Sequence, residues 1–229
     1  GMAKGAGMIE PNMATMLAFL TSDAAVDPEA LQNCLGQAVS QSFNKISVDG
    51  DQSTNDTVLF MANGAAGNSV LDENHPNWNS FTEAVNEAAK QLALKIVEDG
   101  EGATKFVAVT VSGAVSYDDA QKAVRAIANS MLVKTSWYGE DPNWGRVIDA
   151  VGYSGADVRE DLVDINYDDV CAVKNGQTAK NTSVKDLEKV LAQKCFTVNV
   201  NLNLGEETDT VYTCDCSEEY VRINSEYMT

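Results

Sequence analysis

The sequence predicts a mixed α/β fold in which helices and sheets pack in layers. Along the 229 residues, amphipathic helical stripes alternate with short apolar or alternating runs that are typical of strands. Hydrophobic residues make up 44% of the chain, enough to bury a sizeable core as one domain or as two close-packed halves. Because no internal repeat, low-complexity tract or long linker interrupts the pattern, we expect the layers to surround one core.

The first half of the chain predicts three strands and two helices. Met16 opens an apolar run that has the length of a buried strand. Asp27 and Pro28 are typical of an N-cap and a first helical residue. Gly100 follows the longest helical stripe and is typical of the position just past a helix. The predicted elements are strands at residues 16–20, 58–62 and 106–111 and helices at residues 28–42 and 78–98.

The second half predicts further helices and a sheet. Ser116 and Ser183 each begin a capping box, which marks the start of a helix. Asn175 and Gly176 predict a tight turn after the strand at 170–173. A turn at residues 205–207 is expected to join the last two strands into an antiparallel hairpin with one buried face. The predicted elements are helices at 116–132, at 147–151 and from 184, and strands at 162–166, 170–173, 196–204 and 209–216.

The charge of the chain excludes some classes of partner. Its formal net charge is −18, from 16 basic and 34 acidic side chains. Phosphate contacts require Lys and Arg, so we expect no nucleic-acid partner. No apolar run approaches the roughly 18 residues that span a bilayer, and no basic-then-apolar leader precedes the first motif. We therefore expect a soluble, cytoplasmic protein that does not bind membranes.

The cysteines and the single histidine do not form a metal-binding pattern. The five cysteines are Cys34, Cys171, Cys195, Cys214 and Cys216. Their number is odd and their spacing does not repeat, so we interpret them as reduced core thiols and expect neither a metal nor a bound cofactor. His75 lies in a turn-rich loop, so a Ser-His-Asp mechanism would depend on one exposed residue.

The stretch 4–15 contains the first candidate for chemistry. It reads Lys-Gly-Ala-Gly-Met-Ile-Glu-Pro-Asn-Met-Ala-Thr, with Lys4 beside small, flexible residues. Pro11 and Asn12 predict a turn just before Thr15, which the apolar run that follows would hold at the edge of a core. From these residues alone, the local rules favour the alternative interpretation, a glycine-rich loop that enters a core strand.

Three other polar strings interrupt the pattern of helices and strands. Residues 46–57 carry acids, hydroxyls and an amide in a dense run that fits either a hydrogen-bonded turn or a functional loop. Glu101 lies between two glycines, which leave its carboxylate unobstructed or simply form a turn. In residues 138–146, Glu140, Asp141 and Arg146 would form a charge network and Trp144 would line a pocket, unless the segment is a structural corner.

These strings, with residues 1–23 and the last ten residues, resemble the ornithine acetyltransferase family, also called glutamate N-acetyltransferase, of arginine biosynthesis. The resemblance covers almost the whole chain. It implies a helix–sheet sandwich like that of N-terminal-nucleophile aminopeptidases. It also implies self-cleavage between Ala14 and Thr15, so that residues 1–14 are the tail of an α-subunit and residues 15–229 a β-subunit-like catalytic region.

The chemistry that the resemblance implies is acetyl transfer from N-acetyl-L-ornithine to L-glutamate through an acetyl-threonine intermediate. Cleavage would free the α-amine of Thr15, and α-amines titrate at about 7.7 to 8.0, so the nucleophile would carry its own base. The resemblance implies that Glu101 binds a substrate ammonium and Lys4 a substrate carboxylate. It also implies substrate contacts from Asn224 and Thr229. Some family members accept acetyl-CoA as a co-substrate, and the sequence leaves this open.

In the family, a comparable length of chain precedes this segment and forms the α-subunit, which supplies a Thr-Gly pair to the oxyanion hole. The resemblance therefore implies a partner segment, in a heterotetramer of two cleaved α/β pairs. Two alternatives stay open: an amidohydrolase or aminopeptidase on the same scaffold, and an inactive β-subunit fragment without its N-terminal partner. The pattern of Lys4, Glu101 and Asn224 favours transfer over hydrolysis.

Overall fold

The chain divides into two compact units, residues 1–99 and 100–229. The computed structural model describes residues 1–10, 16–52 and 55–226. The expectation of layers around one core was wrong, because each unit has its own sheet, helices and buried side chains. The principal core cluster lies in the second unit, between Val107 and Val211. The mixed α/β class is confirmed.

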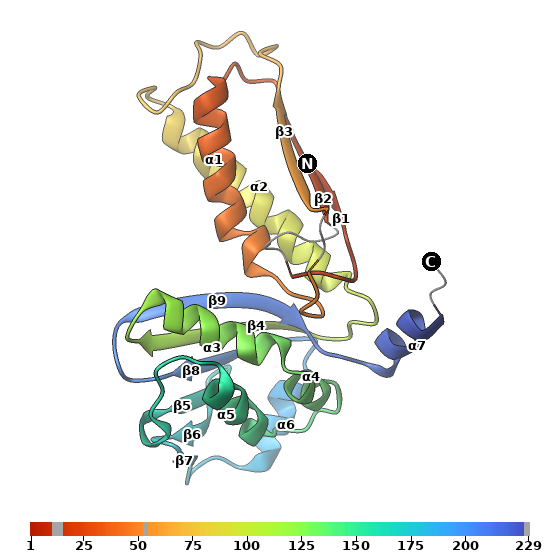
Figure 1. Cartoon of the computed structure of the whole chain (residues 1–229), viewed down its shortest axis with the longest axis vertical. Helices are drawn as coiled ribbons and strands as arrows, with labels where there is room; N and C mark the ends of the chain where they lie inside the picture. The colour runs from red at the N-terminus through yellow and green to blue at the C-terminus, as the bar shows by residue number, and fades with distance from the viewer. Residues whose placement is uncertain (11–15, 53–54, 227–229) are drawn as a thin grey trace. The chain divides into compact units, whose positions relative to one another are not determined.

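The first unit is a three-stranded sheet packed against two helices. Its strands are β1 (Met2–Lys4), β2 (Leu17–Ser22) and β3 (Thr57–Ala62), in the order β1-β2-β3. β2 is antiparallel to β1 and parallel to β3. Helices α1 (Pro28–Gln41) and α2 (Trp78–Glu98) pack on each other beside this sheet, and a short 3₁₀ helix, η1 (Phe43–Lys45), follows α1 (Figure 1).

Local signals in the first unit set its element boundaries. The side chain of Asp27 accepts hydrogen bonds from the backbone N–H groups of Glu29 and Ala30, both at 3.0 Å, which confirms the predicted N-cap. Ala18 and Leu20 of β2 are buried, and Leu17 and Phe19, which alternate with them, are half-buried, as the alternation of a strand requires. Both helices match their predicted bounds to within one residue.

The second unit is a six-stranded sheet in the order β7-β6-β5-β8-β4-β9, with helices packed on it (Figure 1). Helix α3 packs on β4 and β9, and α5 packs on α3. The elements are β4 (Phe106–Ala114), α3 (Tyr117–Asn129), α4 (Met131–Tyr138), α5 (Trp144–Tyr153), η2 (Glu160–Leu162), β5 (Asp164–Tyr167), β6 (Val170–Lys174), β7 (Gln177–Thr178), α6 (Val184–Leu191), β8 (Cys195–Asn201), β9 (Glu207–Cys214) and α7 (Glu218–Glu226).

The predicted hairpin of the last two strands is wrong, because β4 lies between β8 and β9. β4 pairs with β8 in parallel and with β9 in antiparallel orientation. The connection between β8 and β9 instead bends around the end of β4, where the N–H groups of Leu202 and Leu204 donate to the carbonyls of Ser112 and Gly113 at 2.9 and 2.8 Å. Alternation shows which face of a strand is buried but not which strand is its neighbour.

The predicted helix over 116–132 is two helices that meet at Ser130. The backbone of Ser130 is extended (φ −68°, ψ 113°), and its hydroxyl accepts a hydrogen bond from the N–H of Val133. Serine competes for backbone groups in this way, so it ends α3 and caps α4. The two predicted capping boxes are confirmed, because the hydroxyls of Ser116 and Ser183 accept from the N–H groups of Asp119 and Asp186.

The cysteines are all free thiols, as predicted, but they are not all in the core. Cys34, Cys214 and Cys216 are buried. Cys171 is half-buried, and Cys195 is exposed at the first position of β8. The strand begins at the surface, and its alternation leaves the first side chain in solvent.

Asp164 at the start of β5 makes the stability of the second unit depend on pH. It accepts hydrogen bonds from Lys174 Nζ (2.6 Å), Asn175 N (2.8 Å) and Asn203 Nδ2 (3.1 Å). Burial raises its pKa, but these three bonds outweigh burial and hold the pKa below its usual value. The carboxylate therefore stabilises the fold above its unfolded pKa, and this contribution is lost as pH falls through the folded pKa.

We expect the urea midpoint to fall between neutral pH and about pH 3 by more in the unaltered protein than in Asp164→Asn, because the variant has no carboxylate to protonate. Urea unfolding of both proteins at the two pH values measures this. An equal fall of the urea midpoint in the two proteins would show that Asp164 is not the source of this pH dependence.

Candidate active site

The predicted nucleophile and cleavage position, Ala14 and Thr15, lie outside the described residues, but the chain on both sides of them is placed. The β1–β2 register sets Lys4 opposite Leu17. The backbone of Gly5 passes close to Met16, since a Cβ at Gly5 would lie 3.7 Å from the Met16 Cα. Lys4 is exposed, so its ammonium is accessible to a ligand beside the strand that follows Thr15.

The acidic loop 46–57 binds the backbone on both sides of the predicted cleavage position. Asp49 accepts hydrogen bonds from the N–H groups of Met8 (Oδ2, 2.7 Å) and Ile9 (Oδ1, 2.9 Å). Asp56 Oδ1 accepts from the N–H of Met16 at 2.5 Å. The sequence left open whether this loop was a turn or functional. The carboxylates of Asp49 and Asp56 each bind across about 40 residues, holding the two ends of the predicted processing segment.

Asp56 has a second feature that its sequence position does not reveal. Its other oxygen, Oδ2, is buried and has no hydrogen-bond partner among the residues described. A buried carboxylate oxygen without a donor is costly, so such an atom needs an explanation. Beside Asp56 is a hollow of about 350 Å³ within the first unit. Its other lining residues are Met16, Gln32, Leu35, Gly36, Val39, Phe43, Asn44, Thr57 and Val58.

In the second unit, the structure brings together two of the predicted substrate-binding residues, Glu101 and Asn224. Asn224 Nδ2 donates to Glu101 Oε2 at 2.9 Å and to the carbonyl of Tyr220 at 3.0 Å. Both partners only accept, so the amide nitrogen must face them and the amide oxygen must point elsewhere. The pair therefore offers two further acceptors, Glu101 Oε1 and Asn224 Oδ1. Neither has a donor within the described part of the chain, and such an arrangement suits a ligand ammonium. Thr229, the fifth predicted site residue, lies outside the described residues.

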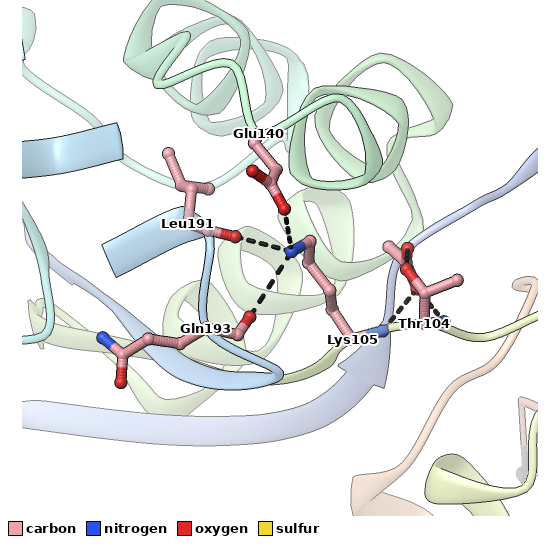
Figure 2. Close-up of polar contacts among 6 residues, drawn as sticks. Thr104, Lys105, Glu140, Leu191 and Gln193 are labelled. Carbon is pink, nitrogen blue, oxygen red and sulfur yellow. Dashed lines mark hydrogen bonds and ion pairs between the residues drawn. The ribbon is translucent and has the colours of Figure 1, made fainter. Parts of the chain in front are cut away.

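Glu101 lies in the segment 101–105, which is anchored through Lys105, a buried side chain that is only 7% exposed. Lys105 Nζ donates to Glu140 Oε1 at 2.9 Å and to the carbonyls of Leu191 and Gln193 at 2.7 and 3.4 Å (Figure 2). Charge-assisted bonds of this kind are the stronger hydrogen bonds in proteins. Glu140 belongs to the string at 138–146, so that string is linked to the segment of Glu101.

The other residues of that string have structural contacts. Arg146 Nη1 donates to the carbonyl of Leu132 (2.6 Å) and to Thr135 Oγ1 (3.2 Å), both on α4. Among the residues described, Arg146 therefore does not form the expected charge network with Glu140. Trp144 packs against the core of the second unit. It also lines a hollow of about 630 Å³ together with the rest of residues 139–145, Val184 and Glu188.

His75 does not act as a base toward its neighbouring serine. Its Nδ1 accepts from the N–H of Asn77 (3.1 Å), and its Nε2 lies 2.8 Å from Ser69 Oγ. Because Nδ1 accepts, the neutral ring carries its proton on Nε2 and donates to Ser69. Over residues 1–10, 16–52 and 55–226, no cluster of three or more His, Cys, Asp or Glu could hold a metal, and no helix is long and apolar enough to cross a membrane.

Comparison with known proteins gives relatives over the whole chain. The profile of the ArgJ family matches residues 1–229. The arginine biosynthesis bifunctional protein ArgJ of Geobacter sulfurreducens is 55% identical over 229 residues, which are 100% of this chain and 58% of that protein. The glutamate N-acetyltransferase of Methanocaldococcus jannaschii is 48% identical over 238 aligned residues, which again cover 100% of this chain and 58% of that protein. The chain thus spans somewhat more than half the length of these curated relatives.

A solved structure agrees with the fold. The crystal structure of ArgJ from Bacillus halodurans superposes with a TM-score of 0.87 at 41% sequence identity, over 93% of this chain and 100% of that chain. The resemblance found from the sequence strings is confirmed by the family profile, the curated relatives and this structure. The chain belongs to the ArgJ family.

Proposed function

We propose that this protein is an acetyltransferase of arginine biosynthesis that moves an acetyl group from N-acetyl-L-ornithine to L-glutamate. Membership of the ArgJ family supports the reaction class, because relatives carry the names arginine biosynthesis bifunctional protein and glutamate N-acetyltransferase. The observation that carries the substrate class is the Glu101–Asn224 pair, which presents acceptors to a ligand cation. In N-acetylornithine the α-nitrogen is acetylated, so the side-chain ammonium is the only one available to this pair.

The proposed reaction uses Thr15 as the nucleophile in two steps. Thr15 Oγ attacks the acetyl carbonyl, its proton passes to the free α-amine, and the C–N bond breaks as the ornithine nitrogen takes that proton. The α-amine of glutamate then attacks the acetyl-threonine ester, and the hydroxyl recovers its proton as N-acetylglutamate leaves. Lys4 supplies a fixed cation for a substrate carboxylate, and Thr229 contacts the substrate.

We propose that Thr15 becomes an N-terminus through self-cleavage after Ala14. Two observations support this. Asp49 and Asp56 hold the backbone on both sides of the cleavage position, which would present that bond in a defined geometry. In addition, 93% of this chain covers the whole of the solved Bacillus halodurans chain, so this relative occurs as a separate chain that is no longer than this one, as cleavage would leave it. Residues 1–14 would be the α-subunit tail and residues 15–229 the catalytic region.

The proposal includes an α-subunit segment as partner, in two cleaved α/β pairs, because the curated relatives are longer than this chain. Acetyl-CoA is a candidate second acetyl donor. The test is to supply N-acetylornithine with a labelled acetyl group, with glutamate as acceptor, to the chain alone and to the chain with an α-segment taken from a relative. Acetyl-CoA replaces N-acetylornithine in a parallel assay.

Labelled N-acetylglutamate would support the proposal. Labelled acetate instead would favour the hydrolase, a second candidate function on the same scaffold. If neither product forms under either condition, the proposed transferase is wrong for this protein.

A further inference from the structure

We propose that Asp215 is a positioning residue for the Glu101–Asn224 pair. The inference rests on the proposed function, since it assigns Asp215 a role in placing the ammonium-binding oxygens of that same site. Asp215 follows β9 directly, is only 3% exposed, and has no catalytic or binding role of its own in the proposed reaction.

Asp215 fixes the end of the segment that carries Glu101. Its Oδ1 accepts hydrogen bonds from the N–H groups of Thr104 (2.8 Å) and Lys105 (2.9 Å). Its Oδ2 accepts from the hydroxyl of Thr104 at 2.5 Å. One buried carboxylate thus orients two successive peptide groups, three residues after Glu101. Such charge-assisted bonds are about twice as strong as neutral ones.

The chain that follows Asp215 continues along the same segment in the opposite direction. Ser217 Oγ donates to the carbonyl of Gly102 at 2.6 Å. Gly102 has φ +68°, and a Cβ there would lie 2.5 Å from Tyr220 N, so only glycine allows the two backbones to approach this closely. The last contact is the bond between Asn224 and Glu101. Contacts near Asp215 therefore determine how Glu101 meets Asn224.

Lys105 gives this arrangement a second fixed point. Asp215 accepts from the backbone N–H of Lys105, while the Lys105 ammonium donates to Glu140 and to the carbonyls of Leu191, the last residue of α6, and Gln193 (Figure 2). The segment 101–105 cannot slide along the axis of β4 without breaking either the hydrogen bonds to Asp215 or those of the Lys105 ammonium. The role of Glu140, which the sequence left open, is therefore to accept a hydrogen bond from the Lys105 ammonium and so help to hold the segment.

The matched variants are Asp215→Ala and Asp215→Asn. An asparagine keeps Oδ1 for both N–H groups, and the hydroxyl of Thr104 can rotate to accept from the new amide. An alanine leaves both N–H groups without their acceptor, and Glu101 shifts from the geometry that a fixed ammonium requires. For N-acetylornithine, we expect the KM of Asp215→Ala to rise by about 10- to 100-fold, with kcat changed by less than about 3-fold. Asp215→Asn is expected to stay within about 3-fold of the unaltered protein in both constants.

Asp164→Ala is the control for general damage to the fold. Asp164 is a carboxylate of the same unit that is 6% exposed and also accepts three hydrogen bonds. Its loss should lower stability without changing the KM. If Asp164→Ala raises the KM as much as Asp215→Ala does, Asp215 is merely structural and the inference is overturned.

Hydrogen exchange gives a readout that does not depend on activity. Exchange at the backbone amides of residues 101–105 and 217–224 should quicken by about 10-fold or more in Asp215→Ala but not in Asp164→Ala. If the unaltered protein has no acetyl transfer, the proposed function fails and exchange alone decides whether Asp215 holds the segment. Unchanged exchange in Asp215→Ala overturns the inference, and so does changed exchange with an unchanged KM in an active protein.

Discussion

Thr15→Ala is expected to leave the chain uncut and to remove acetyl transfer, because the variant has neither the hydroxyl that attacks nor the new α-amine that would activate it. Loss of a nucleophile lowers kcat by on the order of 10⁴- to 10⁶-fold. The intact mass of the protein after incubation at neutral pH measures cleavage: two fragments that meet at Ala14–Thr15 are expected for the unaltered chain and one full-length mass for the variant. Release of N-acetylglutamate measures transfer.

Two further variants make this prediction specific. Thr15→Ser keeps a hydroxyl at the same position and should still be cleaved, although more slowly. Thr21→Ala removes an exposed threonine of β2 and should be cleaved like the unaltered protein. Cleavage of Thr15→Ala at the same bond would show that Thr15 is not the nucleophile. An uncut unaltered chain would favour the fragment alternative, in which processing requires the α-subunit segment.

Much of the fold could be predicted because its signals are local. Asp27 caps α1 through residues two and three positions away, and the capping serines of α3 and α6 act over three positions. Such contacts are visible in a short window of sequence, which is why these helix starts were predicted correctly. Ser130 also acts locally, but the continuous apolar stripe around it hid the break between α3 and α4.

The strand order and the contacts of the candidate site could not be predicted, because they depend on partners that are distant in the sequence. β4 separates β8 from β9, although nothing near residues 195–214 indicates a strand from 106–114 between them. Asp56 binds Met16 across 40 residues, and Asp215 binds Thr104 across 111. The family resemblance named Glu101 and Asn224 as site residues, but only the structure shows their mutual hydrogen bond and the buried carboxylate that orients the segment beside them.

Glu101→Gln is expected to raise the KM for N-acetylornithine by about 30- to 100-fold, with a smaller change in kcat. The glutamine oxygen can still accept from Asn224 Nδ2, so the contact within the pair is kept. The other carboxylate oxygen becomes an NH₂ group, which donates and therefore opposes a ligand ammonium. Removing one charged partner of an ammonium–carboxylate contact typically costs about 2 to 3 kcal/mol, and each 1.4 kcal/mol is about tenfold in affinity.

Steady-state kinetics with two substrates test this reasoning. The second substrate is the analogue of N-acetylornithine in which a hydroxyl replaces the side-chain ammonium. The unaltered protein should prefer the ammonium, and Glu101→Gln should lose most of that preference, because its new NH₂ can donate to a hydroxyl. Glu98→Gln, which removes an exposed carboxylate at the end of α2, is the matched control and should keep the preference. If Glu101→Gln keeps it as well, the ammonium binds elsewhere and the Glu101–Asn224 pair has only a structural role.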